Sequence, residues 1–479
     1  MRRRADASSL FPSALAAGAA RATLPAMRPQ DTIVAPATPR GVSALAIVRL
    51  DGPEAPAIAA AALGRARPPE ARRATLGIWS DLAGRPVDQV VVTVLAPGAS
   101  ATGDAGAEIA CHGNPRLVRD LVADCLARGA RLAEPGEFTR RAFLNGRIDL
   151  TQAEAVGDLI HADSERALEA ARRQLAGELG RAVAGWTDRL LGALASLEAH
   201  IDFPEEDLPP EDPAGPRAAL LALAGELEAA GATARRGKAL REGVRLAVVG
   251  APNAGKSSLL NALCGESRAL VSPEAGTTRD YLEAEVAGLP LRVTAVDTAG
   301  LREGGGEVER AGMRRSVEQA KGADLILCVL DGASPPPALP EDLLALLTPG
   351  RAAVVLNKSD LGENPEAGGF LPALPRLRCC LLDPSAAKAA RDFAARLLDE
   401  ADLGAADARL AVSTRHAEAM GRAATALRAA AAHLAGGSSA TELAATEARV
   451  ALDALGEIVG RVDNERMLDK LFASFCIGK

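Results

Sequence analysis

The stretch Val244-Arg245-Leu246-Ala247-Val248-Val249 runs directly into Gly250-Ala251-Pro252-Asn253-Ala254-Gly255-Lys256-Ser257. The first part is largely apolar and ends at glycine, as buried strands often do. The second part fits G-x-x-x-x-G-K-[ST], in which glycines let backbone amides wrap phosphates and the next helix turns its positive end toward them. Lys256 would neutralise the β and γ phosphates, and the Ser257 hydroxyl would ligate Mg²⁺. These residues predict a strand–loop–helix unit that binds a nucleotide.

Three further elements argue against an ordinary glycine-rich loop. A strand at 291–296 ends in Asp297-Thr298-Ala299-Gly300, whose carboxylate can hold the Mg²⁺ shell and whose last amide can reach the γ-phosphate. A strand at 354–356 leads into Asn357-Lys358-Ser359-Asp360. The carboxylate of this motif can accept two hydrogen bonds from guanine that adenine cannot offer, so GTP is predicted over ATP. Upstream of both, Gly276-Thr277-Thr278-Arg279-Asp280 supplies a threonine to the metal shell.

Two positions depart from the usual pattern of such GTPases. Ser385-Ala386 is our prediction for a fifth, guanine-supporting element, although its surroundings lack the usual glycine. Leu301 follows Gly300, where Ras-like enzymes place a glutamine that orients the attacking water. Leucine cannot orient water, so another group must do so. The charged residues nearby are Arg302, Glu303, Glu307 and Glu309, of which at least two read as part of a solvated acidic loop.

The length of 479 residues suggests about three domains, at roughly 150 residues each. Residues 1–30, rich in Arg, Ala and Ser, are left out of the fold. We interpret them as an extension before a true start at Met27, with an organelle transit peptide as the alternative.

The N-terminal region, residues 31–147, reads as a compact α/β domain. Short apolar runs at 44–48 and 90–95 predict strands, and residues 115–128 predict a helix. Proline and glycine separate these segments, as expected for turns between short elements.

Residues 148–242 read as helical. Thr151-Gln152-Ala153-Glu154 has the spacing of a capping box. Apolar residues then recur every three or four positions from Leu168 to Ile201, which predicts one long amphipathic helix in a bundle. That helix should end at Ile201-Asp202-Phe203-Pro204, and another is expected over 218–236.

Residues 243–402 alternate strands with helices, which indicates a parallel sheet with covering helices. Residues 403–479 are helical again. Ser439-Ala440-Thr441-Glu442 is a second capping-box pattern, and a last apolar helix is expected over 467–475. The predicted fold class is therefore an α/β P-loop domain inserted into an all-α helical domain, preceded by an N-terminal α/β domain.

Composition narrows the classes of function. A net charge of −7 and 2% aromatic residues disfavour a protein that grips nucleic acid mainly by charge or base stacking. The seven cysteines are scattered without a Cys-x-x-Cys pair, so the cytoplasm or another reducing compartment is expected rather than a disulfide framework or structural zinc site. No uninterrupted apolar run has the length of a transmembrane helix.

The chain resembles the tRNA modification GTPase family MnmE, also called TrmE, from about residue 31 to residue 479. Besides the nucleotide motifs, the markers are Asp31-Thr32-Ile33-Val34-Ala35, Pro135-Gly136-Glu137-Phe138-Thr139-Arg140-Arg141-Ala142-Phe143-Leu144-Asn145, Ile201-Asp202-Phe203-Pro204 and the terminal Phe475-Cys476-Ile477-Gly478-Lys479. The resemblance implies an N-terminal domain that binds folate and dimerises, a helical domain, and an inserted G domain.

The resemblance also implies a function. Such proteins are K⁺-stimulated, homodimeric GTP hydrolases that act with an FAD-dependent partner, MnmG, in a heterotetramer. The pair installs aminomethyl or carboxymethylaminomethyl groups at C5 of the wobble uridine in certain tRNAs, with formyl- or methylene-tetrahydrofolate supplying the one-carbon unit. GTP hydrolysis would open and close the G domains. The net charge of −7 then predicts that the flavoprotein carries much of the tRNA contact.

Carried over by motif position, the folate site would use Arg49, Glu108, Arg147 and Lys479. Cations and a carboxylate suit a pterin that carries a glutamate tail. Cys476, in the terminal motif, is read either as a nucleophile or as a thiol that simply packs.

In the G domain, the resemblance implies Mg²⁺ held by Ser257 and Thr278, and a K⁺ that bridges phosphates. The K⁺ would be held by Asn253, Thr277 and the carbonyls of Ser272 and Glu274. Glu309 would orient water, which makes Lys256, Thr278 and Glu309 the catalytic set. The residues expected to bind GTP are Asn253, Ala254, Gly255, Lys256, Ser257, Ser258, Ser272, Gly276, Thr277, Thr278, Asp297, Thr298, Ala299, Gly300, Asn357, Lys358 and Asp360.

Two alternatives stay open. The N-terminal region departs from the family pattern at residues 38–44, at 100–105 and at Asn114, which leaves a GTPase without folate function as one alternative. The other, from a different class, is a GTP-gated switch for ribosome assembly. A basic RNA-binding appendage would favour that class, and none is visible in the sequence.

Overall fold

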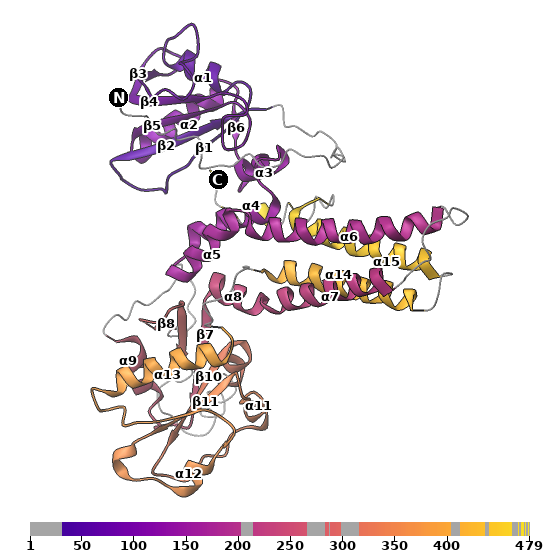
Figure 1. The fold of residues 1–479 in the computed structure, drawn as a ribbon. Helices are drawn as coiled ribbons and strands as arrows, with labels where there is room; N and C mark the ends of the chain where they lie inside the picture. The colour runs from indigo at the N-terminus through magenta and orange to yellow at the C-terminus, as the bar shows by residue number, and fades with distance from the viewer. Residues whose placement is uncertain are drawn as a thin grey trace, which may run out of the picture. The chain divides into compact units, whose positions relative to one another are not determined.

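The computed structural model describes residues 31–202, 214–265, 283–286, 288–297, 316–403, 412–435, 440–461, 468, 471–473, 475 and 478. By packing, the chain divides into one unit of residues 1–145 with 463–479 and a second unit of residues 146–462. The first unit is an α/β fold, and the second contains a helical bundle and another α/β part (Figure 1).

A six-stranded sheet of order β3-β4-β5-β2-β1-β6 forms the first unit. Neighbouring strands are antiparallel except β1 and β6, which are parallel. The elements are β1 (Ile33–Pro36), β2 (Leu45–Asp51), α1 (Ala55–Ala62), β3 (Thr75–Ser80), β4 (Pro86–Leu95), β5 (Gly106–His112), α2 (Pro115–Ala127), β6 (Arg131–Leu132) and α3 (Glu137–Leu144). The strands predicted at 44–48 and 90–95 and the helix predicted at 115–128 are confirmed as β2, β4 and α2.

The two faces of this sheet are covered differently. Strand alternation sends Val48 of β2 and Val92 of β4 into a core shared with Leu121 of α2. On the other face, Phe138 of α3 packs with Ile33 of β1. This second face stays open over β3 and β4, so it carries exposed apolar side chains.

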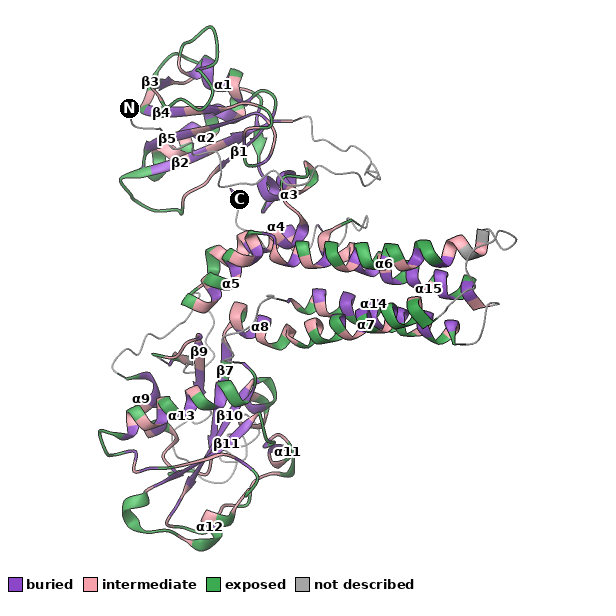
Figure 2. Ribbon diagram, viewed as in Figure 1, coloured by how far each residue is buried: buried purple, intermediate pink, exposed green. Residues whose placement is uncertain are grey.

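The helical part of the second unit takes its helices from both sides of the α/β part. They are α4 (Leu150–His161), α5 (Glu165–Leu175), α6 (Glu178–Asp202), α7 (Ala214–Ala232), α8 (Ala234–Glu242), α14 (Thr414–Leu434) and α15 (Thr441–Val459). One core joins Leu190 of α6, Leu227 of α7, Leu427 of α14 and Leu455 of α15, and the buried stripes of these helices are visible in Figure 2. The prediction of an all-α domain with an α/β insertion is confirmed.

Two predicted helices are each broken in two. The apolar stripe from Leu168 to Ile201 spans α5 and α6, which are separated at Gly177, a residue with φ of +80°. The helix predicted at 218–236 is likewise divided into α7 and α8 at Thr233. The prediction of one continuous helix was wrong because apolar spacing reports amphipathicity and not whether the backbone is continuous.

The capping box predicted at Thr151 is wrong. Helix α4 is capped by Asp149, whose Oδ1 accepts from the Gln152 amide at 2.8 Å while Gln152 Oε1 accepts from the Asp149 amide at 3.0 Å. Thr151 is buried in the first turn. Helix α15 begins at Thr441, and Ser439, on which the second predicted capping box depends, lies outside the described residues. The i, i+3 spacing alone does not set the start of a helix, since several overlapping pairs can satisfy it.

The α/β part is a six-stranded sheet of order β12-β11-β10-β7-β9-β8, parallel except for the antiparallel pair β8 and β9. The elements are β7 (Val244–Gly250), α9 (Lys256–Cys264), β8 (Glu283–Glu285), β9 (Val293–Asp297), β10 (Leu325–Asp331), α11 (Glu341–Leu344), β11 (Ala352–Asn357), the 3-10 turn η2 (Ser359–Leu361), α12 (Pro365–Gly369), β12 (Arg376–Arg378) and α13 (Ala386–Glu400). The strands predicted at 244–249, 291–296 and 354–356 are confirmed as β7, β9 and β11.

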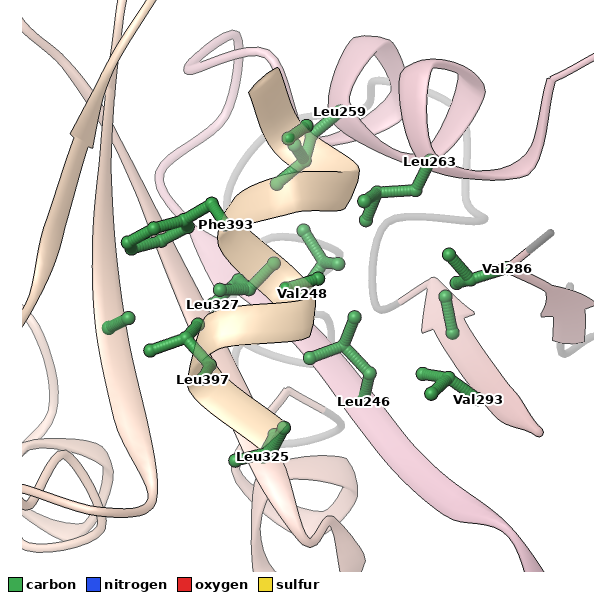
Figure 3. Packing of buried hydrophobic residues seen from close by; sticks show 14 of the residues in the cluster. Leu246, Val248, Leu259, Leu263, Val286, Val293, Leu325, Leu327, Phe393 and Leu397 are labelled. Carbon is green, nitrogen blue, oxygen red and sulfur yellow. The ribbon is translucent and has the colours of Figure 1, made fainter. Parts of the chain in front are cut away.

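Helices cover both faces of this sheet. Leu246 and Val248 of β7 face a core that includes Leu259 of α9 and Phe393 of α13 (Figure 3). Val249, with the opposite orientation, packs in a second core with α11. A strand buried on both faces needs a continuous apolar run, which explains the sequence of β7.

The helix predicted at 467–475 lies mostly outside the described residues. Within the described ranges, every helix is too short or too polar to cross a lipid bilayer.

Candidate nucleotide-binding site

The loop from β7 to α9 depends on two glycines. A Cβ on Gly250, whose φ is +145°, would lie 2.2 Å from the carbonyl oxygen of Val329. A Cβ on Gly255, whose φ is +107°, would lie 2.1 Å from Nδ2 of Asn357. Both positions therefore require glycine for backbone conformation and for close packing. They hold the loop tightly against β10 and β11.

The lysine of this loop reaches back over the backbone. Lys256 Nζ donates to the carbonyls of Gly250 at 3.0 Å and Ala251 at 2.7 Å. Ser257 is exposed and Ser258 is half-buried in the first turn of α9. The ammonium group and the free end of a helix thus meet at one loop, an arrangement suited to an anion.

The carboxyl ends of three parallel strands meet at this loop. Asp297 ends β9 and pairs with Val248 of β7, and β11 ends at Asn357. The Gly250–Ser257 loop, Asp297 and the Asn357–Asp360 motif therefore lie along one edge of the sheet. Ligands of open α/β sheets bind at this edge, because it carries the loops and helix N-termini.

The fourth motif is tied directly to the loop. Asn357 is 5% exposed, and its Nδ2 donates to the Ala254 carbonyl at 2.9 Å. Lys358 has φ of +61°, and its Nζ lies 2.7 Å from Oδ2 of Asp331. A hydrogen bond from this ammonium lowers the pKa of Asp331. Asp360 is exposed in η2, where its carboxylate can accept from a ligand.

The predicted fifth motif does not fit a base-binding role. The Ser385 amide donates to Oδ1 of Asp383 at 2.8 Å, and the Ala386 amide donates to the Asp383 carbonyl at 3.0 Å. Both amides are used to start α13. Ser385-Ala386 therefore cannot offer a backbone donor to a base, and this prediction was wrong.

Several predicted site residues lie outside the described residues. They are Ser272, Glu274, Gly276, Thr277, Thr278, Thr298, Ala299, Gly300, Glu309, Cys476 and Lys479. Of the predicted metal ligands, Ser257 and Asn253 are described. Asn253 is exposed, with φ of +59°, a conformation that asparagine tolerates better than most residues.

Two predicted folate residues contact each other in the first unit. Arg49 of β2 and Glu108 of β5 are paired across the sheet, and Arg49 Nη2 lies 2.9 Å from Glu108 Oε1. The Arg49 guanidinium also lies 5.6 Å from the ring centre of Phe138. Arg147 is exposed and belongs to the second unit.

The C-terminal segment packs in the first unit. Gly478 is buried with φ of +98°, and a Cβ there would lie 2.1 Å from the Pro36 carbonyl oxygen. A Cβ on Gly136 would lie 2.8 Å from the Phe472 carbonyl oxygen. These contacts bring the last described residue before Lys479 beside β1.

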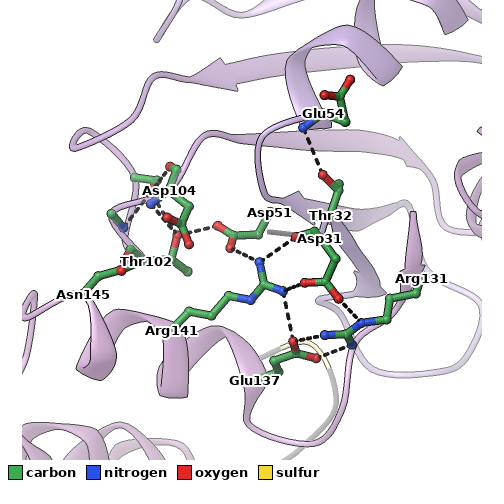
Figure 4. Close-up of polar contacts among 12 residues, drawn as sticks. Asp31, Thr32, Asp51, Glu54, Thr102, Asp104, Arg131, Glu137, Arg141 and Asn145 are labelled. Carbon is green, nitrogen blue, oxygen red and sulfur yellow. Dashed lines mark hydrogen bonds and ion pairs between the residues drawn. The ribbon is translucent and has the colours of Figure 1, made fainter. Parts of the chain in front are cut away.

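A buried ionic network, which the sequence reasoning missed, stands next to this segment (Figure 4). The side chain of Arg141 is 1% exposed and contacts Asp31 at 2.8 Å, Glu137 at 3.1 Å and Asp51 at 3.4 Å. Burial raises the pKa of Asp51 to about 6, although hydrogen bonding from Thr102 opposes the rise. The charged run within 135–145 was the available signal, but the sequence could not show which carboxylates meet it.

Comparisons with known proteins agree with this arrangement. A family model described as "MnmE helical domain" matches residues 150–476, and one described as "GTP-binding protein TrmE N-terminus" matches residues 32–147. The tRNA modification GTPase MnmE of Opitutus terrae is 45% identical over 457 residues, covering 94% of this chain and 99% of that protein. Proteins of the same name from Phenylobacterium zucineum and Akkermansia muciniphila are each 41% identical over 94% of this chain, covering 100% and 99% of their own lengths. The chain therefore belongs to the tRNA modification GTPase MnmE family.

Proposed function

We propose that this chain hydrolyses GTP in the modification of wobble uridine in tRNA. The observation that carries the proposal is the shared edge of the second sheet, where the Gly250–Ser257 loop, Asp297 and the Asn357–Asp360 motif come together. Family membership supports the tRNA role.

In this proposal the described residues have distinct tasks. Asp360 accepts from the guanine edge, while Asn357 holds the motif against the phosphate loop. Lys256 leaves its backbone carbonyls to neutralise the β and γ phosphates. The amides of the loop and of the first turn of α9 surround the phosphates.

The metal ions are part of the proposal. Mg²⁺ would be held by Ser257 and Thr278, and K⁺ by Asn253, Thr277 and the carbonyls of Ser272 and Glu274. The exposed Ser257 hydroxyl and Asn253 amide oxygen suit hard cations, which prefer oxygen ligands. Both ions would neutralise charge that develops on the phosphates. Glu309 would orient the attacking water.

We also propose a tetrahydrofolate site in the N-terminal domain. Its residues would be Arg49, Glu108, Arg147 and Lys479. The contact between Arg49 and Glu108 and the packing of Gly478 beside β1 support the grouping of three of these positions. A cation, a carboxylate and the nearby Phe138 ring suit a flat heterocycle with an anionic tail.

The open face of the first sheet, over β3 and β4, supports a homodimer. Leu76 and Ile78 of β3 are 62% and 55% exposed, and Val91, paired with Leu76, is 37% exposed. By strand alternation, Arg49 and Glu108 lie on this face too. A second copy of this domain would cover the apolar side chains and place the folate residues beside the interface.

Completing the reaction calls for a second protein. We propose an FAD-dependent partner of the MnmG type, which would form a heterotetramer with the homodimer and carry much of the tRNA contact. The net charge of −7 fits a shared RNA task. The cytoplasm is the proposed compartment, because the described cysteines are free thiols.

Mass spectrometry of tRNA from a deletion strain tests the function. Loss of aminomethyl and carboxymethylaminomethyl groups at the wobble uridine is expected, with rescue by the wild-type gene. If the levels of modified wobble uridine are the same as in the parent strain and ribosome assembly is defective, the GTP-gated switch is supported instead. Loss of modification without saturable folate binding would support a different one-carbon source.

A further inference from the structure

An aspartate and a histidine are paired at one end of the open face of the first sheet. Asp88 Oδ1 lies 2.8 Å from Nδ1 of the His112 ring, and Asp88 Oδ2 accepts a hydrogen bond from the His112 backbone amide at 2.9 Å. The side chain of Asp88 is 8% exposed, whereas that of His112 is 65% exposed. A nearly buried carboxylate therefore holds an imidazole that faces solvent.

The imidazole ring is not needed to hold the two strands together. The bond from the His112 backbone amide to Asp88 can form with any residue except proline at position 112, and β4 and β5 are already paired through their backbones. The ring adds its second nitrogen. When Nδ1 donates to Asp88, the ring orientation is fixed and Nε2 is left to meet a ligand, since within the described ranges it has no partner.

Strand alternation puts His112 on the same face as two of the proposed folate residues. Positions 108, 110 and 112 of β5 share this face, and they pair across the sheet with positions 49, 47 and 45 of β2. The order along the face is therefore the Arg49–Glu108 ion pair, then Ile47 with Ala110, and then Leu45 with His112. At about 3.3 Å per residue, the ion pair and the histidine are roughly 13 Å apart.

This order matches the parts of a folate. The ion pair offers one acceptor and one donor to the hydrogen-bonding edge of a pterin, and the Phe138 ring centre lies 5.6 Å from the Arg49 guanidinium. Ile47 and Ala110 are half-buried and Leu45 is 64% exposed, so the middle of the face is an apolar floor for an aminobenzoyl ring. The glutamate tail at the far end of the ligand then comes to His112.

We propose that His112 binds a carboxylate of the glutamate tail of tetrahydrofolate, and that Asp88 is its positioning residue. The protonated imidazole donates from Nε2 to the tail carboxylate, which makes a charge-assisted hydrogen bond. This inference rests on the proposed folate site. It adds a subsite that distinguishes tetrahydrofolate from the same heterocycle without a glutamate.

Two ligands titrated calorimetrically against the full chain test the inference: 5-formyl-tetrahydrofolate, and 5-formyl-tetrahydropteroate, which lacks the glutamate. The wild type should bind the folate more tightly. His112→Gln should raise the Kd for the folate about fivefold to tenfold, because a charge-assisted hydrogen bond is lost, and should leave the Kd for the pteroate unchanged. Asp88→Asn should show the same selective loss to a smaller degree, because the imidazole keeps its place without its anionic partner.

His161→Gln is the matched control. It changes another exposed histidine, on α4, whose ring Nδ1 lies 2.9 Å from the Gly157 carbonyl oxygen. This variant should bind both ligands with wild-type affinity. Equal affinity of the wild type for the folate and the pteroate, or an equal loss of both ligands in His112→Gln, would overturn the inference.

The ring signals of the wild-type protein give a second readout that needs no variant to bind ligand. The chain has five histidines, so their carbon-13 resonances can be followed one by one, and the resonance missing from His112→Gln identifies His112. This resonance should shift with the folate and stay in place with the pteroate. The same response to both ligands would contradict the tail subsite.

Arg49→Gln separates this inference from the folate site itself. If the site is correct, this variant should weaken both ligands, because the heterocycle that meets Arg49 is common to them. No saturable binding by the wild type, or unchanged binding of both ligands by Arg49→Gln, would contradict the folate site and the inference with it. Weakened binding in Arg49→Gln with wild-type binding in His112→Gln would contradict only the tail subsite.

Discussion

The side-chain amide of Asn357 binds the Ala254 carbonyl at 2.9 Å, so the base-recognition motif and the phosphate loop are one connected structure. Oδ1 of the same Asn357 side chain accepts a hydrogen bond from the Leu381 amide at 3.0 Å. The residue is almost fully buried, and both polar ends of its side chain are satisfied. An asparagine in this position therefore organises the site as well as belonging to a motif.

Asn357→Ala should weaken GDP binding tenfold or more. The substitution leaves a buried carbonyl and a buried amide without partners, which costs about 1–3 kcal/mol each when they stay dry. Titration of nucleotide against the purified chain measures the effect. Asn364→Ala, which removes a helix cap at α12, should lower stability while preserving affinity. If both variants lose GDP affinity to a similar extent, the loss in Asn357→Ala reflects general destabilisation and not a role in the site.

GTP turnover should depend on the monovalent cation. K⁺ should accelerate turnover relative to Na⁺, because the proposed site would hold K⁺ against the phosphates and neutralise the charge that develops there. Asn253→Gly should remove the acceleration while preserving the loop, since glycine readily adopts the φ of +59° found there. Steady-state phosphate release in the two salts measures this. Equal turnover of the wild type in K⁺ and Na⁺ would refute the cation assignment.

Gly478→Ala should reduce tetrahydrofolate affinity about tenfold or more, because a Cβ 2.1 Å from the Pro36 oxygen forces the C-terminal segment away from β1. Isothermal titration with 5-formyl-tetrahydrofolate measures the change. Gly64→Ala is the matched control: its φ is +66°, but its Cβ would meet open space. Unchanged tetrahydrofolate affinity in Gly478→Ala would show that the C-terminal segment is not part of the folate site.

Asp51 should make the first unit less stable as the pH rises from about 4 to 6. Its native pKa of about 6 lies above the ordinary value of 3.8, so the folded state holds a proton that the unfolded state releases in this interval. The free energy of unfolding of Asp51→Asn, relative to that of the wild type, should therefore rise by up to about 3 kcal/mol as the pH increases from about 4 to 6.

Hydrogen exchange of β2 amides at several pH values measures that difference. A constant difference between wild type and Asp51→Asn across the interval would show that Asp51 stays ionised.

Glu154→Ala should destabilise the helical part by about 1–3 kcal/mol, because it leaves the buried His416 and the half-buried Arg415 without their shared carboxylate. Glu154 Oε1 lies 2.9 Å from Arg415 Nη2, and Oε2 lies 2.9 Å from His416 Nε2. These contacts join α4, before the α/β insertion, to α14, after it. Chemical unfolding followed by circular dichroism measures the loss. Glu169→Ala, at an exposed position on α5, should have little effect; equal losses would remove the special role of the pair.

Much of the architecture was readable because its signals are local. The apolar run 244–249 and the glycine-rich loop after it predicted β7, the loop and α9 correctly. The helix breaks at Gly177 and Thr233 were missed because an apolar stripe reports which face is buried and not whether the backbone is continuous. The cap at Asp149 was missed because its competitor at Thr151 has the same kind of spacing.

By itself, the sequence determined the class of fold, the order of the nucleotide motifs and the preference for guanine. Each depends on residue types at short spacing, and backbone sterics and hydrogen-bonding chemistry act at that range. Only the tertiary structure decided that Leu381 meets Asn357, that Arg141 collects three carboxylates, and that Gly478 lies against Pro36. These contacts join residues far apart in the chain. They depend on how strands pair and helices pack, which no local pattern encodes.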